Sequence, residues 1–274
     1  MIRDVHHVGI AVRDMDAAYS FYRDALGLPL VKEGDAPARG VKAAMLAAGR
    51  SYLELVQPTT DRSPFANHIE ERGEGLHHLA LLSDAVDLQI EALREAAVPL
   101  EDHEPREGFT GRLSYLHPQA FDGALLEVVQ PEEGLRGNKD RNGHITRIDH
   151  VVLRVPDAQA VCSRFESYFG VATKRSFERG PMLFAFLRPG DVIIEVIGPK
   201  DGGGDPNSGR IAGLAFEVKG IDDLAASLKE QGFPVGEPHA ALQGGRIVSV
   251  HHSGACGVAV AFIDFTGSPG PANR

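Results

Sequence analysis

The amino-acid sequence predicts an α+β fold in which one structural unit, a strand followed by a helix and further strands, occurs four times. Three observations lead to this prediction. Four segments begin with an aliphatic run, a helical stretch follows each run, and the units recur at regular spacing. The leading positions are His7, His78, His150 and Gly213. The first two are 71 residues apart, and the next pair is 72 apart.

Each unit opens with a predicted strand. The leading runs are about five residues long and rich in β-branched and aliphatic residues, as buried strands are. These runs lie in residues 7–12, 78–82, 150–155 and 213–218. Further strand-like runs follow the helices, for example 41–46 and 52–56 in the first unit.

A predicted amphipathic helix of about three turns follows each leading strand. An aspartate six to nine residues after each leading position is expected to cap the helix by accepting its free backbone N–H groups. These aspartates are Asp14, Asp84, Asp157 and Asp222. Three of the helices end at a glycine, as helices commonly do: Gly27, Gly170 and Gly232.

The units pair into two predicted domains. We expect a first domain over residues 1–131, a polar and glycine-rich linker over 132–144, a second domain over 145–266 and a tail over 267–274. A glycine-rich stretch at 202–209 separates the third and fourth units. Because it does not open a helix after a strand, we interpret it as a connection and not as a phosphate-binding loop.

The composition is that of a soluble globular protein. Of its 274 residues 43% are hydrophobic and 24% charged, and no run approaches the length of a membrane span. A net charge of −10 argues against a nucleic-acid partner. Cys162 and Cys256 are too few for a disulfide framework, and no leader-like segment precedes the first strand. We therefore expect a cytoplasmic protein without membrane or nucleic-acid partners, either a monomer or a homodimer.

The first half carries a predicted metal site. His7 and His78 lead their strands, and each is followed after nearly the same interval by a carboxylate in an apolar strand, Glu54 and Glu127 respectively. A buried carboxylate requires a partner or a metal. Since all four residues fall at repeat-equivalent positions, packing of the two units is expected to bring them together. Two imidazoles and two carboxylates suit a divalent cation such as Co, Ni, Zn, Mn or Fe.

The second half carries an incomplete copy of this set. It keeps His150 and Glu195, but Gly213 and Ala261 stand where the other two ligands would be. Three roles are open for this half: to cover the first half, to complete its pocket, or to bind a ligand without metal.

Other histidines have weaker signals. His6 and His77 precede the two predicted ligands on the opposite strand face, so we expect them to support the ligands or to pack. The remaining histidines, His117 and His251 among them, show no matched positions and are expected on the surface or in loops. His117 is the best candidate for an exception, because it precedes the strand of Glu127.

The opening His7-Val8-Gly9-Ile10-Ala11-Val12, with Phe21-Tyr22 and Leu26-Gly27, resembles the vicinal oxygen chelate superfamily of glyoxalases, bleomycin resistance proteins and dioxygenases. The resemblance implies four βαβββ modules that form two tandem domains with cupped mixed β-sheets. Residues 5–131 resemble methylmalonyl-CoA epimerase more than glyoxalase I, in the segments 54–58, 63–66, 75–78 and 111–118.

This resemblance implies that His7, His78 and Glu127 are metal ligands, with Glu54 as the fourth. It also implies an isomerase or lyase that enolises a small carbonyl or acyl-CoA substrate, with Glu127 or Glu54 as the catalytic base. One branch of the family has a candidate catalytic glutamate at the position of Ala43. Two alternatives remain: a non-haem Fe(II) ring-cleaving dioxygenase, and a non-catalytic protein that binds a small molecule, as resistance proteins do.

Overall fold

The computed structural model describes residues 1–135, 143–241 and 244–266. The predicted tail 267–274 lies outside these residues, as do positions 136–142 of the predicted linker. The predicted domain boundaries therefore stay a prediction. Within the described residues, no helix is long and apolar enough to cross a membrane.

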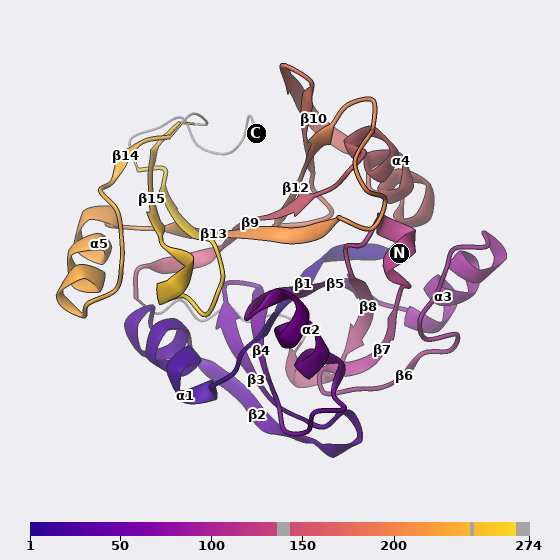
Figure 1. Ribbon diagram of the computed structural model, residues 1–274, viewed down its shortest axis with the longest axis horizontal. Coiled ribbons are helices and arrows are strands. Elements are labelled where there is room, and N and C mark those ends of the chain that lie inside the picture. The colour runs from indigo at the N-terminus through magenta and orange to yellow at the C-terminus, as the bar shows by residue number, and fades with distance from the viewer. Residues whose placement is uncertain (136–142, 242–243, 267–274) are drawn as a thin grey trace. The chain divides into compact units, whose positions relative to one another are not determined.

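The predicted α+β class is confirmed. In the first half the elements are β1 (Ile2–Ala11), α1 (Met15–Ala18), η1 (Tyr19–Ala25), β2 (Leu30–Ala36), β3 (Val41–Ala48), β4 (Ser51–Pro58), α2 (Pro64–Arg72), β5 (Gly75–Ser83), α3 (Val86–Glu95), β6 (Arg106–Glu107), β7 (Gly111–Tyr115) and β8 (Leu126–Pro131) (Figure 1). In the second half they are β9 (Ile145–Arg154), α4 (Ala158–Phe169), β10 (Thr173–Arg179), β11 (Met182–Leu187), β12 (Ile193–Pro199), β13 (Arg210–Val218), α5 (Ile221–Glu230), β14 (His239–Ala240), β15 (Arg246–Val250) and β16 (Val260–Asp264).

These elements form four βαβββ modules, one for each predicted unit. They are β1–β4, β5–β8, β9–β12 and β13–β16, each with a helix after its first strand. Two details were not predicted. The first helix continues from α1 into a π-helical segment, η1, and an additional helix, α2, lies between the first and second modules.

The two modules of each half together form one mixed eight-stranded sheet. The strand orders are β2-β3-β4-β1-β5-β8-β7-β6 and β10-β11-β12-β9-β13-β16-β15-β14. In the modules β5–β8, β9–β12 and β13–β16, the first strand pairs in parallel with the last. The other strands of a module pair antiparallel. The first and last strands of each module therefore occupy the middle of a sheet.

By their tertiary contacts the described residues group into two compact units, and each unit combines a module of the first half with a module of the second. One unit holds the start of β1, the strands β5–β8 except the first residues of β5, and most of β9–β12. The other holds the remainder of β1, the strands β2–β4, and most of β13–β16. Each unit is therefore stabilised by contacts between residues that are far apart in the chain.

In the unit that contains β5–β8, helix α4 packs on the segment before β8. The Arg164 guanidinium donates to the Asp122 carboxylate at 2.6 Å, and the ring of Phe121 lies 4.8 Å from that of Phe165. Gly123, with φ +108°, lies close to the segment before β13. A Cβ atom at this position would be 2.4 Å from the Asn207 carbonyl oxygen.

The unit that contains β2–β4 has the equivalent contact. The Tyr22 hydroxyl donates to the Ala255 carbonyl at 2.9 Å. Gly257 is the repeat counterpart of Gly123, and a Cβ atom there would lie 1.9 Å from the Glu74 carbonyl oxygen. Only glycine allows the two backbones to approach so closely, and it also tolerates the φ of +77° found there.

The predicted helix caps are correct in two modules and wrong in the other two. Asp14 and Asp157 accept backbone N–H groups at the starts of α1 and α4. Asp84 and Asp222 instead pair with arginines, Arg3 and Arg246 respectively.

In those two modules the capping acceptor comes from the end of the module's last strand. The Gln130 side-chain oxygen accepts from Val86 N at 3.1 Å. The Asp264 carboxylate accepts from the backbone N–H groups of Gly220, just before α5, and Ile221, its first residue. In both modules an acceptor about 44 residues away in sequence bonds to the free N–H groups at the helix start. Asp84 and Asp222 are therefore not needed as caps and form ion pairs instead.

Candidate metal centre

Four neighbouring strands in the middle of the first sheet carry the four predicted ligands. In the order β4-β1-β5-β8 these are Glu54, His7, His78 and Glu127. The two histidine strands are adjacent, and a carboxylate strand lies on either side of them. All four side chains are buried, with residue exposures of 6%, 0%, 0% and 1% in that order.

The polar atoms of these residues converge. Nε2 of His7 lies 3.0 Å from Nε2 of His78. The Glu127 carboxylate lies 3.8 Å from each of these nitrogens, through a different oxygen in each case. His7, Glu54 and His78 each offer one ligand atom, and these atoms all lie within 4.8 Å of one another. The structure thus brings together the four residues that the repeat singled out.

The donor set fits a divalent cation. Metal–nitrogen bonds of histidine are about 2.0–2.1 Å long, so two such nitrogens at a right angle are about 3.0 Å apart. The His7–His78 separation has this value. The 3.8 Å distances to Glu127 correspond to ligands at a wider angle. Mixed nitrogen and oxygen ligands suit Co, Ni, Zn, Mn and Fe alike, so this geometry leaves the choice of metal open.

Burial lowers the pKa values of His6 and His7 and so favours their neutral forms. It lowers the pKa of His7 well below its usual value, and the neighbouring His6 and His78 lower it further. Burial also lowers the pKa of His6 to about 4. Because metal ligation requires a deprotonated imidazole nitrogen, neutral rings at pH 7 favour binding.

This burial predicts an acid-labile metal-free protein. The pKa of His6, about 4 in the folded state, lies below the value of 6.5 for an unfolded histidine. Between these two pH values the unfolded chain binds more protons than the folded protein. The contribution of His6 to the free energy of unfolding is therefore fully present above pH 6.5 and is lost as the pH falls towards 4. His6 alone is expected to contribute about 3 kcal/mol to this loss.

Urea unfolding of chelator-treated protein at pH 7, 6 and 5 measures this effect. The midpoint should fall with the pH, and it should fall less in a His6→Phe variant. Equal midpoints across this range would contradict the prediction.

Tyr115 belongs to the site, although the sequence analysis did not assign it a role. It lies opposite Glu127 in the antiparallel pair β7–β8, and its hydroxyl is 3.4 Å from Nε2 of His78. The sequence places Tyr115 in the strand-like run before that of Glu127. Only the register of β7 and β8 shows that these two residues lie opposite each other. A phenol here offers a hydrogen bond to a bound substrate.

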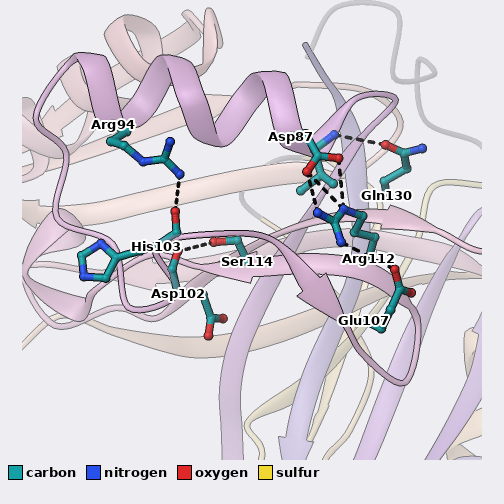
Figure 2. Close-up of polar contacts among 9 residues, drawn as sticks. Asp87, Arg94, Asp102, His103, Glu107, Arg112, Ser114 and Gln130 are labelled. Carbon is teal, nitrogen blue, oxygen red and sulfur yellow. Dashed lines mark hydrogen bonds and ion pairs between the residues drawn. The ribbon is translucent and has the colours of Figure 1, made fainter.

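A polar network fixes the strands that carry Tyr115 and Glu127. Figure 2 shows Arg112 of β7 between Asp87 at the start of α3 and Glu107 of β6, and Gln130 of β8 at the same helix start. The Arg112–Asp87 pair is bidentate, with a shortest distance of 2.7 Å. Its repeat counterpart in the second half is the pair Arg246–Asp222. The network therefore belongs to the architecture of the module and supports the site indirectly.

In the second half, the strand register confirms the equivalences assigned from the sequence. Ala261 pairs with Ala215, two residues after Gly213, as Glu127 pairs with Ala80, two residues after His78. The two retained residues contact each other, since Nε2 of His150 lies 3.6 Å from the Glu195 carboxylate. This half keeps an imidazole–carboxylate pair but lacks the other two ligands.

The histidines beside the ligands differ in their contacts. His77 stacks on Phe65 of α2 with ring centroids 4.2 Å apart, which is a packing role. His6 contacts His7 directly, with 2.7 Å between their Nδ1 atoms. The expectation that His117 and His251 have no matched positions is wrong. Each begins a 3-10 turn before the last strand of its module and accepts a backbone N–H two residues on.

Comparisons with known proteins match segments in both halves of the chain. The family model described as Glyoxalase/Bleomycin resistance protein/Dioxygenase superfamily matches residues 6–115 and 149–249. The uncharacterised protein YqjC of Bacillus subtilis is 36% identical over 127 residues, which are 46% of this chain and 91% of that protein. The ethylmalonyl-CoA/methylmalonyl-CoA epimerase of Cereibacter sphaeroides is 34% identical over 133 residues, which are 47% of this chain and 99% of the enzyme.

One solved structure is similar over nearly the whole chain. A mutant of 4-hydroxymandelate synthase from Streptomyces coelicolor matches with a TM-score of 0.70 and 18% identity, over 98% of this chain and 94% of that one. At this identity the likeness shows the fold alone. Because the family model matches segments in both halves that together exceed half of the sequence, the chain belongs to the glyoxalase/bleomycin resistance/dioxygenase superfamily.

Proposed function

We propose that the first half is a divalent-metal-dependent enzyme that removes and returns a proton next to the carbonyl group of a small substrate. The observation that carries this proposal is the convergence of two buried imidazoles and two buried carboxylates from four adjacent strands. The ethylmalonyl-CoA/methylmalonyl-CoA epimerase from Cereibacter sphaeroides aligns with 47% of this chain, about the length of one half. An acyl-CoA of the methylmalonyl type is therefore the first substrate to test.

His7 and His78 are the proposed anchors of the cation, with Glu127 and Glu54 completing the set. A bound divalent cation would supply Lewis-acid stabilisation of the negative charge that develops on the carbonyl oxygen. Tyr115 would orient the substrate through its hydroxyl, which faces the same nitrogen of His78.

The arrangement of the carboxylates suits proton transfer on two sides. Glu54 and Glu127 come from strands that lie on either side of the histidine strands. One carboxylate would take the proton from the carbon next to the carbonyl, leaving the electron pair in the enolate. The other would begin in its protonated form and donate that proton to the opposite face, which inverts the carbon and leaves the two carboxyl groups with their protonation states exchanged. Ala43 carries no ionisable group and does not serve as a base, so we assign the proton transfer to these two glutamates.

The test begins with the metal content of untagged protein. Protein stripped with a chelator is then reloaded separately with Co, Ni, Zn, Mn or Fe(II). Each form is assayed for deuterium uptake from D2O into methylmalonyl-CoA and for turnover of hemithioacetals. Metal-dependent exchange supports the proposal.

The other outcomes would contradict it. Oxygen consumption that strictly requires Fe(II) would identify a dioxygenase. Tight binding of a small molecule by metal-free protein, without exchange, would identify a binding protein.

Removal of the metal is also expected to lower thermal stability. A ligand that binds only the folded state stabilises it by about 4 kcal/mol at a concentration 1,000 times its Kd. The melting temperature should therefore rise when metal is added back to stripped protein. A His7→Ala/His78→Ala double variant serves as control and should show no such rise. Equal rises in both proteins would place the metal elsewhere.

A further inference from the structure

His6 makes two hydrogen bonds that connect the candidate ligand His7 to a distant segment of the chain. Its Nδ1 lies 2.7 Å from Nδ1 of His7, and its Nε2 lies 2.8 Å from the Leu135 carbonyl oxygen. The His6 and His7 rings meet edge to face at 80°. Both residues are buried, so these contacts are shielded from water.

The partners determine which nitrogens carry hydrogen. A carbonyl oxygen only accepts, so Nε2 of His6 must be the donor to Leu135. In a neutral imidazole the other nitrogen then has a lone pair, and Nδ1 of His6 accepts from Nδ1 of His7. Nε2 of His7 is thereby left as the lone-pair nitrogen, and it is the atom that lies 3.0 Å from Nε2 of His78.

We propose that His6 is a positioning residue that holds His7 in the tautomer and orientation in which Nε2 binds the cation, with Leu135 holding His6 in turn. This inference rests on the proposed metal site. Hydrogen bonds to the outer nitrogen of a ligating histidine fix its tautomer and ring direction in metal proteins generally.

The second half supports this assignment by contrast. The counterpart of His6 is Asp149, which precedes His150 and pairs with Arg147 at 3.0 Å. Where the ligand set is incomplete, this position therefore carries a different side chain that makes an ion pair.

Three substitutions separate the two bonds of His6. The His6→Asn variant places an oxygen near the position of Nδ1, so it keeps the acceptor for His7 and loses the bond to Leu135. The His6→Gln variant places a donor near the position of Nε2, so it keeps the Leu135 bond and loses the acceptor. The His6→Phe variant keeps the ring shape and loses both. His77→Phe, beside the other ligand, is the matched control.

The first readout is the affinity for Zn²⁺, measured by competition with a chromogenic chelator. Loss of an outer hydrogen-bond partner weakens metal binding by about 10- to 100-fold. We expect this loss in the His6→Phe and His6→Gln variants, a smaller loss in His6→Asn, which lacks only the bond to Leu135, and an affinity close to wild type for His77→Phe. Equal affinity of all variants would overturn the inference, whereas a wild type that takes up no Zn²⁺ would overturn the metal site itself and this inference with it.

The second readout does not depend on metal. ¹⁵N chemical shifts of the stripped protein report which nitrogen of His7 carries hydrogen. We expect the Nδ1–H form in the wild type and in the His6→Asn variant, and a shift towards the Nε2–H form in His6→Phe. A wild type with hydrogen on Nε2 of His7 would overturn the positioning role even if the protein binds metal.

Discussion

A Glu127→Gln variant is expected to lose at least about 100-fold in the rate of deuterium exchange while keeping its fold, because general acid–base catalysis contributes about 10²- to 10⁴-fold. Glutamine has nearly the shape of glutamate, but it carries no negative charge and does not take up a proton as a base. Glu127 is 1% exposed and lies 3.8 Å from both imidazoles, so little room exists for water to replace it.

The metal content of the same variant separates its two possible roles. A stoichiometric metal content with lost exchange would assign Glu127 mainly to proton transfer. Lost metal and lost exchange together would assign it mainly to ligation. The same pair of measurements on Glu54→Gln assigns the other carboxylate.

Glu195→Gln is the control for this series. Glu195 is the repeat counterpart of Glu54, is similarly buried, and pairs with His150 in the incomplete half. We expect its exchange rate to equal that of the wild type. Full activity of the Glu127→Gln variant would reject the catalytic role, and inactivity of Glu195→Gln would show that the second half takes part in the reaction.

A Gly257→Ala variant is expected to lose about 2–5 kcal/mol of unfolding free energy. A Cβ atom at this position would lie 1.9 Å from the Glu74 carbonyl oxygen, which is backbone and does not move aside cheaply. Overpacking of this kind costs about 1–3 kcal/mol. The left-handed φ of +77° adds about 1–2 kcal/mol for any residue with a Cβ. Denaturant unfolding measures the sum.

Gly232→Ala separates the two contributions. Gly232 has nearly the same φ, +84°, but nothing lies within 4 Å of the position that its Cβ would take. Its loss should therefore be only the backbone contribution of about 1–2 kcal/mol. Equal losses in the two variants would show that the close approach of Gly257 to Glu74 contributes nothing to stability.

The contact of Gly257 also bears on the site. Glu74 immediately precedes β5, which begins at Gly75 and carries His78. A displaced Glu74 is therefore expected to disturb the candidate ligand strand, and the Gly257→Ala variant should also bind Zn²⁺ more weakly than Gly232→Ala.

Much of the site could be predicted from the sequence because it rests on a repeat. Side chains alternate along a strand with a period of two, so a residue at an equivalent position in two modules faces the same side of the sheet. His7 could thus be matched with His78, and Glu54 with Glu127, before any contact was known. The vacant positions at Gly213 and Ala261 followed from the same matching.

Other features depended on contacts between distant segments. The start of α3 is capped by Gln130, 44 residues after Val86, and not by the nearby Asp84. Tyr115 joins the site through the register of β7 and β8, which local patterns do not determine.

The sequence by itself determined the α+β class, the four modules and the four residues of the candidate metal centre, because periodicity and repeat spacing are present in the order of the residues. The tertiary structure alone decided the grouping of modules from different halves into common units, the place of Tyr115, and the two bonds of His6. The physical reason is that these contacts join residues brought together only by strand register and packing. His6 and Leu135, for example, are 129 residues apart and meet at 2.8 Å.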